Sequence, residues 1–508
     1  MALRRTAAVP LLALAVTLAA PAPVTGAPPG GDHPRTLHVA SSARAPGDGS
    51  VARPFPRISQ AVGAAEAGDT VLVGRGRYAE LVTSVRPGRP TAPIRIVGRP
   101  DAHLVGPKGI ARDRLVQLLH DHVTVESLEL SHANILVWVQ GTSGVRLLGN
   151  RLHDAGGECV RLKDFAQRNE VAGNAIARCG RVRFDLAKGA KNGEGVYIGT
   201  APEQAGGRPD RSDSNLVHRN RVTSTAECVD VKEGASRNRV EHNRCAGSDD
   251  PDGAGFSSRG DRTTFRANIS TRHAGAGVRL GGDRPTQGLH NTVVGNILAD
   301  NAGYGLKVLR SPQGSNDATL SGNEVHDNKL SGIDVNNSLR LRLTGNVVYG
   351  NDIGLHVHGR SRSVTADANR LTANRADGLR VATGASAVTA SRNLIDFNPR
   401  AGVFVAEGTA RIGPANRLLD NEMGVWLSSD AAGTAVLDNS IEANVLDGVH
   451  LAGLRVGQVR GNTIRANRKA AFSVATRGAA SLFLAANRLA GNPEKERVRV
   501  EGHPQPTG

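Results

Sequence analysis

Short apolar segments recur along the chain at a nearly constant spacing, and an asparagine follows each of them. Most gaps between successive asparagines are 23 to 25 residues, two are 27 and 28, and one is 46. A period of this length indicates a solenoid, in which each repeat stacks on the preceding one. The asparagines of this series are Asn150, Asn174, Asn220, Asn243, Asn268, Asn296, Asn323, Asn346, Asn369, Asn393, Asn416, Asn439, Asn462 and Asn487.

Each repeat combines strand-forming and turn-forming positions, as residues 323–335 show with Asn-Glu-Val-His-Asp-Asn-Lys-Leu-Ser-Gly-Ile-Asp-Val. Alternating apolar residues predict short strands with one face inward. Glycine and asparagine are expected to supply the positive φ angles of the sharp turns between strands. Coils stacked about 4.8 Å apart would place each asparagine over the last, so that their amides form hydrogen-bonded ladders. We therefore predict an all-β fold, a right-handed parallel β-helix of about 14 or more coils.

The composition agrees with this fold and limits the classes of partner that the protein is expected to bind. The 508 residues include 61 glycines and only 3% aromatic residues, against 39% hydrophobic residues, which suits a stack of small aliphatic side chains. The formal charge of +16 favours a polyanionic partner, although the basic residues are dispersed and a solvated basic surface is the alternative. Nucleic acid is the weakest option, because few aromatic rings are present to stack on bases.

The N-terminus has the organisation of a signal peptide. Arg4 and Arg5 precede an apolar run over residues 7–20, and small residues follow up to Gly26. We therefore expect a signal peptide over residues 1–26 and a secreted, extracellular protein. No later stretch approaches the roughly 18 apolar residues that a membrane span requires.

The β-helix domain is expected over residues 27–492, with a C-terminal tail at 493–508 and a cap at about 53–80. An amphipathic helix around Ile58–Ala67 would cover the open end of the solenoid, as terminal repeats must. This segment resembles the N-terminal cap of pectate-lyase-like β-helix proteins, a resemblance that concerns fold rather than chemistry. We expect the protein to be a monomer.

All four cysteines fall within one 87-residue stretch, and export permits disulfides. We predict that Cys159 pairs with Cys179 and that Cys228 pairs with Cys245. Each bridge is expected to link adjacent coils.

The repeat register predicts which side chains share one face. The second strand of each coil is aligned on its first inward residue, and residues one and three positions later point outward. The aligned inward residues are Val160, Val196, Val229, Phe256, Val278, Leu306, Ile333 and Leu355. Between residues 150 and 285 the outward columns combine acids, bases and a tyrosine, whereas the C-terminal coils show no such convergence. The columns are Arg161, Tyr197, Asp230, Ser257 and Arg279, then Lys163, Gly199, Lys232 and Arg259, and just before the strand Glu158, Glu194 and Glu227.

Insertions into the repeat occur in the same coils, at Arg181–Gly193, Thr200–Asn215 and Ser248–Gly253. Long excursions from one face of a rigid solenoid usually build a binding groove. The alternative is that the insertions are merely tolerated and the charges merely solvated.

These residue types suit cleavage of an acidic polysaccharide by β-elimination. Stacked carboxylates favour Ca²⁺, and Glu158, Glu194 and Glu227 are the candidate ligands. Lys232 is the candidate general base, because neighbouring cations are expected to lower its pKa. Arg259 or Tyr197 would protonate or stabilise the leaving oxygen. Arg279, with the metal, would neutralise the substrate carboxylate, and the remaining candidate substrate-binding residues are Lys163, Asp230 and Lys307.

Two segments resemble the active-site coils of family-six polysaccharide lyases, the alginate and chondroitin B lyases. They are Glu227-Cys-Val-Asp-Val-Lys232, followed by residues 239–243, and Gly255-Phe-Ser-Ser-Arg259. The resemblance implies that Lys232 is the base, Arg259 the acid and Glu227 a calcium ligand. The chain departs from the family at Thr225, where a second glutamate is expected, and at Gly260-Asp261, which replaces His-Gly-Asn.

Other functions on this fold remain open. A C5-epimerase uses a similar proton abstraction, and a binding protein would need no base. A glycoside hydrolase would need clustered aspartates, for which the candidates are Asp230, Asp249, Asp250 and Asp252. The sequence shows no zinc-type ligand spacing.

The lyase hypothesis makes a geometric prediction. Lys232 and Arg259 should lie on neighbouring coils and enter one groove beside Glu227, while the asparagines from Asn323 to Asn462 should line one edge of the helix. A structure with scattered asparagines would contradict the solenoid fold, and a Lys232 side chain facing away from Arg259 would contradict the lyase mechanism.

Overall fold

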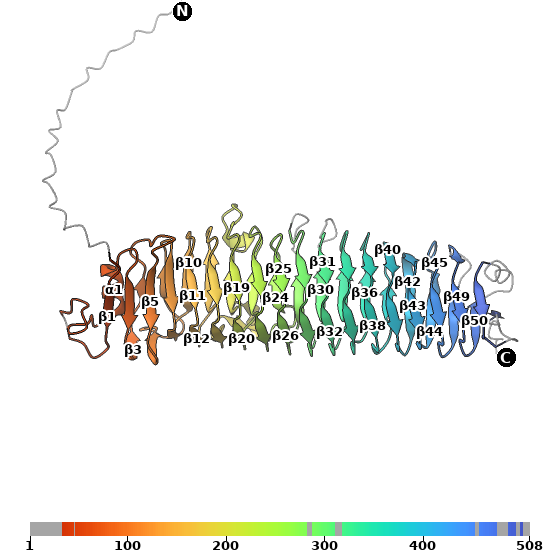
Figure 1. The fold of residues 1–508 in the computed structure, drawn as a ribbon, viewed down its shortest axis with the longest axis horizontal. Helices are drawn as coiled ribbons and strands as arrows, with labels where there is room; N and C mark the ends of the chain where they lie inside the picture. Colours follow the sequence, from red (N-terminus) through yellow and green to blue (C-terminus); the bar gives the residue numbers. More distant parts are fainter. Residues whose placement is uncertain are drawn as a thin grey trace, which may run out of the picture. The chain divides into compact units, whose positions relative to one another are not determined.

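The computed structural model describes residues 33–44, 46–281, 287–309, 317–452, 457–474 and 486–493, and the backbone of 498–500. The signal peptide expected at residues 1–26 and most of the C-terminal tail lie outside these residues. From Arg35 onward the chain forms a right-handed parallel β-helix of about 16 turns, which confirms the predicted fold (Figure 1). Within the described ranges, no helix has the length and apolar character needed to cross a bilayer.

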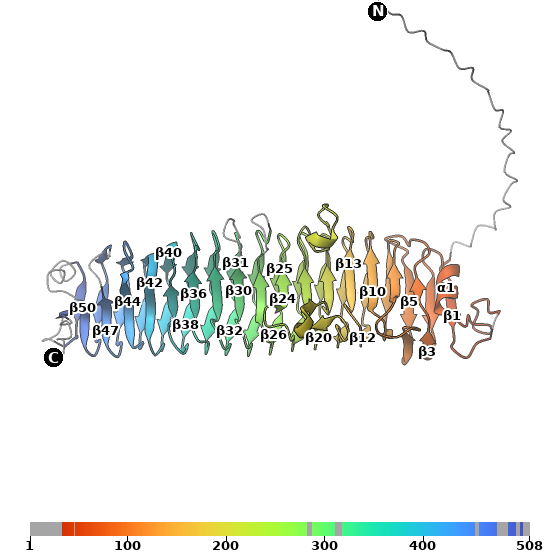
Figure 2. The ribbon, with the colours of Figure 1, turned by 180° about the vertical axis from the view of Figure 1, so that it is seen from behind.

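Each turn contributes one short strand to each of three parallel sheets, which we call A, B and C. In one turn β21 (Val229–Val231) belongs to sheet C, β22 (Arg239–Glu241) to sheet A and β23 (Arg244–Ala246) to sheet B. Each strand pairs with the equivalent strand of the next turn, so the strands stack side by side along the solenoid (Figure 1, Figure 2).

Sheet C confirms the predicted register. Val160, Val196, Val229 and Phe256 pair in sequence, and the same row continues through Val278 to Leu355. The strands of sheet C are β4 (Val82–Thr83), β7 (Arg114–Leu118), β10 (Ile135–Gln140), β13 (Val160–Lys163), β18 (Val196–Ile198), β21, β24 (Ala254–Ser258), β27 (Ala276–Leu280), β30 (Leu306–Leu309), β33 (Ile333–Asn336), β36 (Leu355–His358), β39 (Leu379–Val381), β42 (Ala401–Ile412), which continues into sheet A, β44 (Met423–Asp430), β47 (Asp447–Leu451), β50 (Ala470–Val474) and β52 (Val498–Val500).

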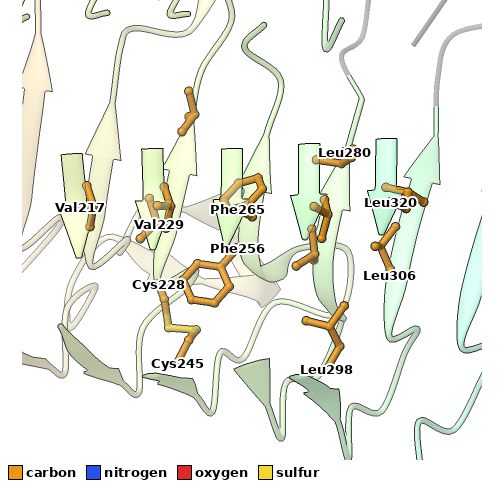
Figure 3. Close-up of a cluster of buried hydrophobic side chains, with 14 of the residues drawn as sticks. Val217, Cys228, Val229, Cys245, Phe256, Phe265, Leu280, Leu298, Leu306 and Leu320 are labelled. Atoms are coloured by element: carbon orange, nitrogen blue, oxygen red, sulfur yellow. A yellow bond between two sulfur atoms is a disulfide. The ribbon is translucent and has the colours of Figure 1, made fainter. Parts of the chain in front are cut away.

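The inward side chains of the three sheets form one continuous aliphatic core. Around the middle turns Phe256 and Phe265 lie with ring centroids 6.0 Å apart, beside the disulfide between Cys228 and Cys245 (Figure 3). The second disulfide joins Cys159 to Cys179, so both predicted pairings are confirmed. The sequence separations of 20 and 17 residues are slightly less than one repeat, and each bridge joins neighbouring turns as expected: residues 155–157 are hydrogen-bonded to residues 178–181 of the next turn, and Cys245 pairs with Val222 of the preceding turn, next to Cys228.

The asparagine ladder is present from Asn150 to Asn487. At each step the side-chain oxygen of one asparagine accepts hydrogen bonds from the backbone N–H and the amide of the asparagine one turn earlier, as Asn393 does for Asn369 at 2.8 and 3.0 Å. A second ladder runs from Asn301 to Asn492. These buried amides satisfy backbone groups at the corners of the coil.

Glycine supplies positive φ angles as expected, but the ladder asparagines do not. The left-handed residue precedes the ladder asparagine at most steps, as at Gly322 (φ 59°) and Arg392 (φ 54°), because the asparagine itself is positioned by its ladder bonds. The repeat glycine before each strand of sheet C has a different role. A Cβ at Gly332 would lie 2.4 Å from Val348 Cγ1 and 2.7 Å from Asn351 Nδ2, so close packing requires glycine there.

The N-terminal end is covered by α1 (Ile58–Ala64), which packs against β1 (Thr36–Val39), β2 (Thr70–Val73) and β4. Ile58, Ala61 and Val62 form its buried face, as the cap prediction requires. The helix ends three residues before the predicted end, because the Asp69 carboxylate accepts the backbone N–H of Glu66 and turns the chain.

Replacing one ladder residue tests this account of stability. Asn393→Ala removes the acceptor for Asn369 and the donor to Ala366 O and Asn416 Oδ1, leaving buried groups unpaired. We expect the free energy of unfolding to fall by about 1–3 kcal/mol or more, measured by urea denaturation. Asn192→Ala, in an exposed loop, is the control, and an equal effect of both substitutions would contradict the ladder's role.

Candidate active site

The candidate site lies on the outer surface of sheet C, where β13, β18, β21 and β24 stack. Arg161, Tyr197, Asp230 and Ser257 occupy one row of directly paired residues across these strands. Arg279 and Lys307 continue the same row on β27 and β30. Charged groups from consecutive turns therefore meet because the register places them on adjacent strands.

The insertions flank this row on both sides. Residues 181–193 precede β18, and residues 200–215 follow it; the yellow segment projecting near β19 (Leu216–His218) in Figure 1 belongs to the second insertion. Lys191 Nζ lies 3.0 Å from Asp250 Oδ1 and 2.9 Å from Asp252 Oδ2, which ties the first insertion to the loop before β24. The second insertion is anchored by Asp210, whose carboxylate accepts hydrogen bonds from Thr200 and from two backbone N–H groups of the preceding turn.

Lys232 and Arg259 converge on one buried carboxylate. Lys232 Nζ contacts Asp230 Oδ2, and Arg259 Nη2 donates to the same oxygen at 3.3 Å. Lys232 Nζ also lies 3.8 Å from Glu194 Oε1 and 4.6 Å from the centre of the Tyr197 ring. The structure thus brings Lys232, Arg259, Asp230, Glu194 and Tyr197 into one cluster.

Three carboxylates of this cluster can approach a common point. Glu194, Glu227 and Asp230 each present an oxygen within 4.8 Å of the others, and all three are buried. Glu158, the third glutamate of the predicted column, instead accepts a hydrogen bond from Arg161 Nη1 at 2.9 Å. Asp230, rather than the predicted Glu158, therefore joins Glu194 and Glu227 in the carboxylate group.

Acids outnumber bases in this buried network, and their pKa values show the effect. Among the described residues, five carboxylates face three cations, which are Arg161, Lys232 and Arg259; the carboxylates are Glu158, Glu194, Glu227, Asp230 and Glu233. Burial, reinforced by neighbouring carboxylates, raises the pKa of Glu194 to about 7 and that of Glu227 to about 8. Burial also acts to raise the pKa of Asp230, but Lys232 and Arg259 outweigh it and lower that pKa to about 2.

Lys232 differs from the expectation. Burial acts to lower its pKa, but Asp230 and Glu194 outweigh burial, and the pKa of Lys232 is raised. The predicted lowering by neighbouring cations does not occur, because the carboxylates of Asp230 and Glu194 affect the pKa of Lys232 more strongly than Arg259 does. Burial likewise raises the pKa of Tyr197, whose ring lies beneath Lys232 and 4.5 Å from the Arg161 guanidinium carbon.

A cavity lies next to the cluster, on the side of Glu233. The Lys232 side chain is 9% exposed and that of Arg259 19% exposed, and Arg259 Nε lies 3.5 Å from Glu233 Oε1. Glu233 in turn lines a cavity of about 460 Å³, together with Thr200, Arg208, Asp261 and Gln287. The second insertion forms one wall of this cavity.

The remaining predicted residues lie farther along the sheet. Lys163 lies two strands before Lys232, with its Nζ 5.2 Å from the centre of the Trp138 ring. Arg279 and Lys307 are paired side by side, and among the described residues no carboxylate forms an ion pair with either.

Two residues near the cluster were missed in the sequence. Trp138 lies in the same row, one strand before Arg161, with the Arg114 guanidinium 3.4 Å above its ring. Extending the column alignment by one turn would have found it. Glu233 follows Lys232 directly, and no periodic signal marks its approach to Arg259.

Comparison with known proteins agrees with the fold. A family model described as a right handed beta helix region matches residues 205–346, 290–441 and 331–492, which together cover more than half of the chain. No curated protein sequence matches.

Similar solved structures include an alginate lyase from Paenibacillus sp. str. FPU-7, with 20% identity, 57% of this chain and 94% of that chain covered, and a TM-score of 0.48. A mannuronic acid specific family 6 polysaccharide lyase from human gut microbiota has 14% identity, coverage of 71% and 84%, and a TM-score of 0.44. A mannuronan C-5 epimerase module from Azotobacter vinelandii has 16% identity, coverage of 88% and 94%, and a TM-score of 0.40. At these identities the likeness concerns the fold alone.

The raised carboxyl pKa values predict a pH dependence of stability. In the folded state Glu194 and Glu227 hold protons up to about pH 7 and 8, whereas in the unfolded chain they lose them near pH 4.3. Their stabilising contribution is complete below the unfolded pKa and is lost as pH rises through the folded values. Without divalent cations, the thermal midpoint should therefore fall between about pH 5 and pH 8.

The double variant Glu194→Gln, Glu227→Gln should flatten this dependence, because amides do not titrate. Glu203→Gln, at an exposed position of the second insertion, should leave it unchanged. An identical slope in the wild type and the double variant would contradict the assignment.

Proposed function

The chain belongs to the family of right-handed β-helix proteins, and from that premise we propose that it is a secreted lyase that cleaves an acidic, uronic-acid-containing polysaccharide by β-elimination. The observation that carries the proposal is the convergence of Lys232 and Arg259 on Asp230, beside Glu194 and Glu227, in a site flanked by insertions. Buried cations and carboxylates in one cleft are typical of acid–base chemistry.

A uronic-acid polymer suits the charges along sheet C. Arg279 and Lys307 extend from the cluster in the same row, and no described carboxylate pairs with them. Two cations on adjacent strands, about 4.8 Å apart, can each bind a carboxylate of the polymer. The excess basic charge of the chain also favours association with a polyanion.

The elimination assigns separate tasks to the two central cations. Lys232, as the free amine, accepts the C5 proton; the C5–H electron pair forms the C4=C5 double bond, and the C4–O4 bond breaks. Arg259 is the more exposed of the two, so its guanidinium faces the leaving O4 and stabilises its charge until it takes a proton. Tyr197 is only 3% exposed and lies under Lys232, so it acts as a positioning residue.

The carboxylate group fits a calcium ion. Glu194, Glu227 and Asp230 offer up to six hard oxygen donors, and among the described residues the carboxylates of the cluster outnumber the cations. A bound Ca²⁺ would neutralise the substrate carboxylate and so acidify the C5 proton. The same carboxylates hold the proton on Lys232, so their engagement elsewhere favours the free amine that the reaction needs.

Substitution of Lys232 tests the proposed base. Lys232→Arg keeps a positive charge beside Asp230 but cannot act as a base, and we expect elimination to fall by at least about 10²–10⁴-fold. The assay follows the ultraviolet absorbance of unsaturated uronate on alginate, pectate, chondroitin and dermatan. Lys329→Ala, at an exposed position, is the control. An unchanged rate in Lys232→Arg would exclude Lys232 as the base.

Metal removal tests the carboxylate group. A chelator should abolish elimination and added Ca²⁺ should restore it, whereas Glu227→Gln should raise the Ca²⁺ concentration needed. Product analysis by NMR separates the other functions on this fold. Inversion at C5 without chain cleavage would identify an epimerase, and binding without any product would identify a carbohydrate-binding protein.

A further inference from the structure

A second cluster of ligating side chains lies farther along sheet C, on β33 and β36. His356 and His358 are two residues apart on β36, so both side chains point outward from the same face of the sheet. Asp334 is paired directly with His356 on the neighbouring strand. Asp334 Oδ1 lies 3.0 Å from His358 Nε2 and 3.6 Å from His356 Nδ1, so two imidazole nitrogens surround one carboxylate oxygen.

The three ligands differ in burial in a way that suits an ion held at the surface. The Asp334 side chain is 3% exposed, whereas those of His356 and His358 are 20% and 23% exposed. A buried carboxylate with only two imidazoles around it keeps its negative charge close to the proposed ion. Solvent reaches the histidines directly, so an ion has a route into the cluster.

Neighbouring cations do not occupy the cluster. Lys307 precedes Asp334 in the row, but its ammonium lies over the Tyr304 ring, 4.8 Å from the centre. Arg380, which follows His356, is paired with Asp377 instead. Within the described ranges, the ion pairs of Asp334 involve only the two histidines.

The ligand atoms of the three side chains are already close together. The imidazole rings are stacked 4.1 Å apart with an interplanar angle of 12°. One ring nitrogen of each histidine and one oxygen of Asp334 all lie within 4.8 Å of one another. Bonds of about 2.0–2.2 Å to one ion require these atoms to draw closer, and χ2 of histidine is a soft torsion.

A comparable cluster on sheet B is less suited to a cation. His103, Glu129 and His153 also lie close enough to share an ion. However, Arg151 Nη1 is 3.8 Å from Glu129 Oε2, and Arg178 Nη2 is 3.3 Å from His153 Nδ1. Both ring nitrogens of His153 are already hydrogen-bonded, to Glu129 at 2.8 Å and to Asp154 at 2.7 Å, and Arg151 and Arg178 pair with those two carboxylates. Among the described residues, no guanidinium pairs with Asp334.

We propose that Asp334, His356 and His358 bind a divalent transition-metal ion of the Zn²⁺ type, in a site separate from the carboxylate group at Lys232. Two imidazoles and one carboxylate favour Zn²⁺, Ni²⁺ or Cu²⁺ over Ca²⁺ and Mg²⁺, which require oxygen ligands. Three protein ligands leave a position open to solvent or to an incoming anionic group. The repeat register already places Asp334 beside His356, one position after the aligned residues Ile333 and Leu355, so the sequence carried a signal for this pair.

Calorimetric titration of the metal-free, full-length protein with ZnCl₂ tests the proposal. We expect one Zn²⁺ to bind, and His356→Ala and His358→Ala each to weaken binding by more than about 100-fold, because even outer-shell substitutions cost 10–100-fold. With Co²⁺, a visible d–d absorption band should appear in the wild type and be absent from both variants.

Three further variants keep the result unambiguous. Circular dichroism shows whether each histidine variant folds. If one does not, Asp334→Asn replaces it in the test, because this substitution preserves the shape of the side chain and should also abolish ion binding. The double variants His103→Ala, His153→Ala and Glu194→Gln, Glu227→Gln should bind Zn²⁺ as the wild type does. No binding by the wild type, unchanged binding in His356→Ala, or loss of binding in either double variant would overturn the proposal.

Discussion

The hydrogen bonding between successive turns sets the position of every side chain in this solenoid. Parallel strands fix which residues lie side by side, and the buried asparagine ladder fixes the corners between them. A slip of one residue would turn the charged row of sheet C into the core and expose the aliphatic side chains. The register is therefore strongly specified, and the placement of functional groups follows from it rather than from local loop structure.

Burial is what gives the cluster around Asp230 its chemistry. Lysine, arginine and carboxylate side chains are costly to remove from water unless they are paired, and here the insertions cover them while the strands hold them together. The arrangement leaves more acids than bases under cover, which raises the affinity of Glu194 and Glu227 for protons. A site with this imbalance has carboxylates left to bind a further cation, whereas in a balanced ion-pair network every carboxylate is already neutralised.

The fold and the rows of the site could be predicted from the sequence because both depend on periodicity. The inward series from Val160 to Leu355, the ladder and both disulfide pairings are found where the repeat places them. Side-chain partners could not be predicted in the same way. Glu158 pairs with Arg161 instead of joining the other glutamates, and Lys232 faces acids more closely than bases. Such choices depend on side-chain direction and on the course of the insertions, which periodicity does not encode. The asparagines were wrongly expected to supply positive φ angles for a related reason, since the ladder uses the asparagine and the turn uses the residue before it.

The outer row of sheet C also fixes the spacing between the functional groups along the solenoid. Because each turn advances the row by one residue, the distance between any two groups on it changes only in whole steps of about 4.8 Å. Duplication or loss of a complete turn between Arg279 and Asp334 would alter the spacing of the two clusters without disturbing either of them. A polymer lying along the row would meet these groups at intervals close to the length of one sugar unit. The number of turns, rather than any single residue, thus becomes the variable by which such a protein can be matched to a periodic ligand.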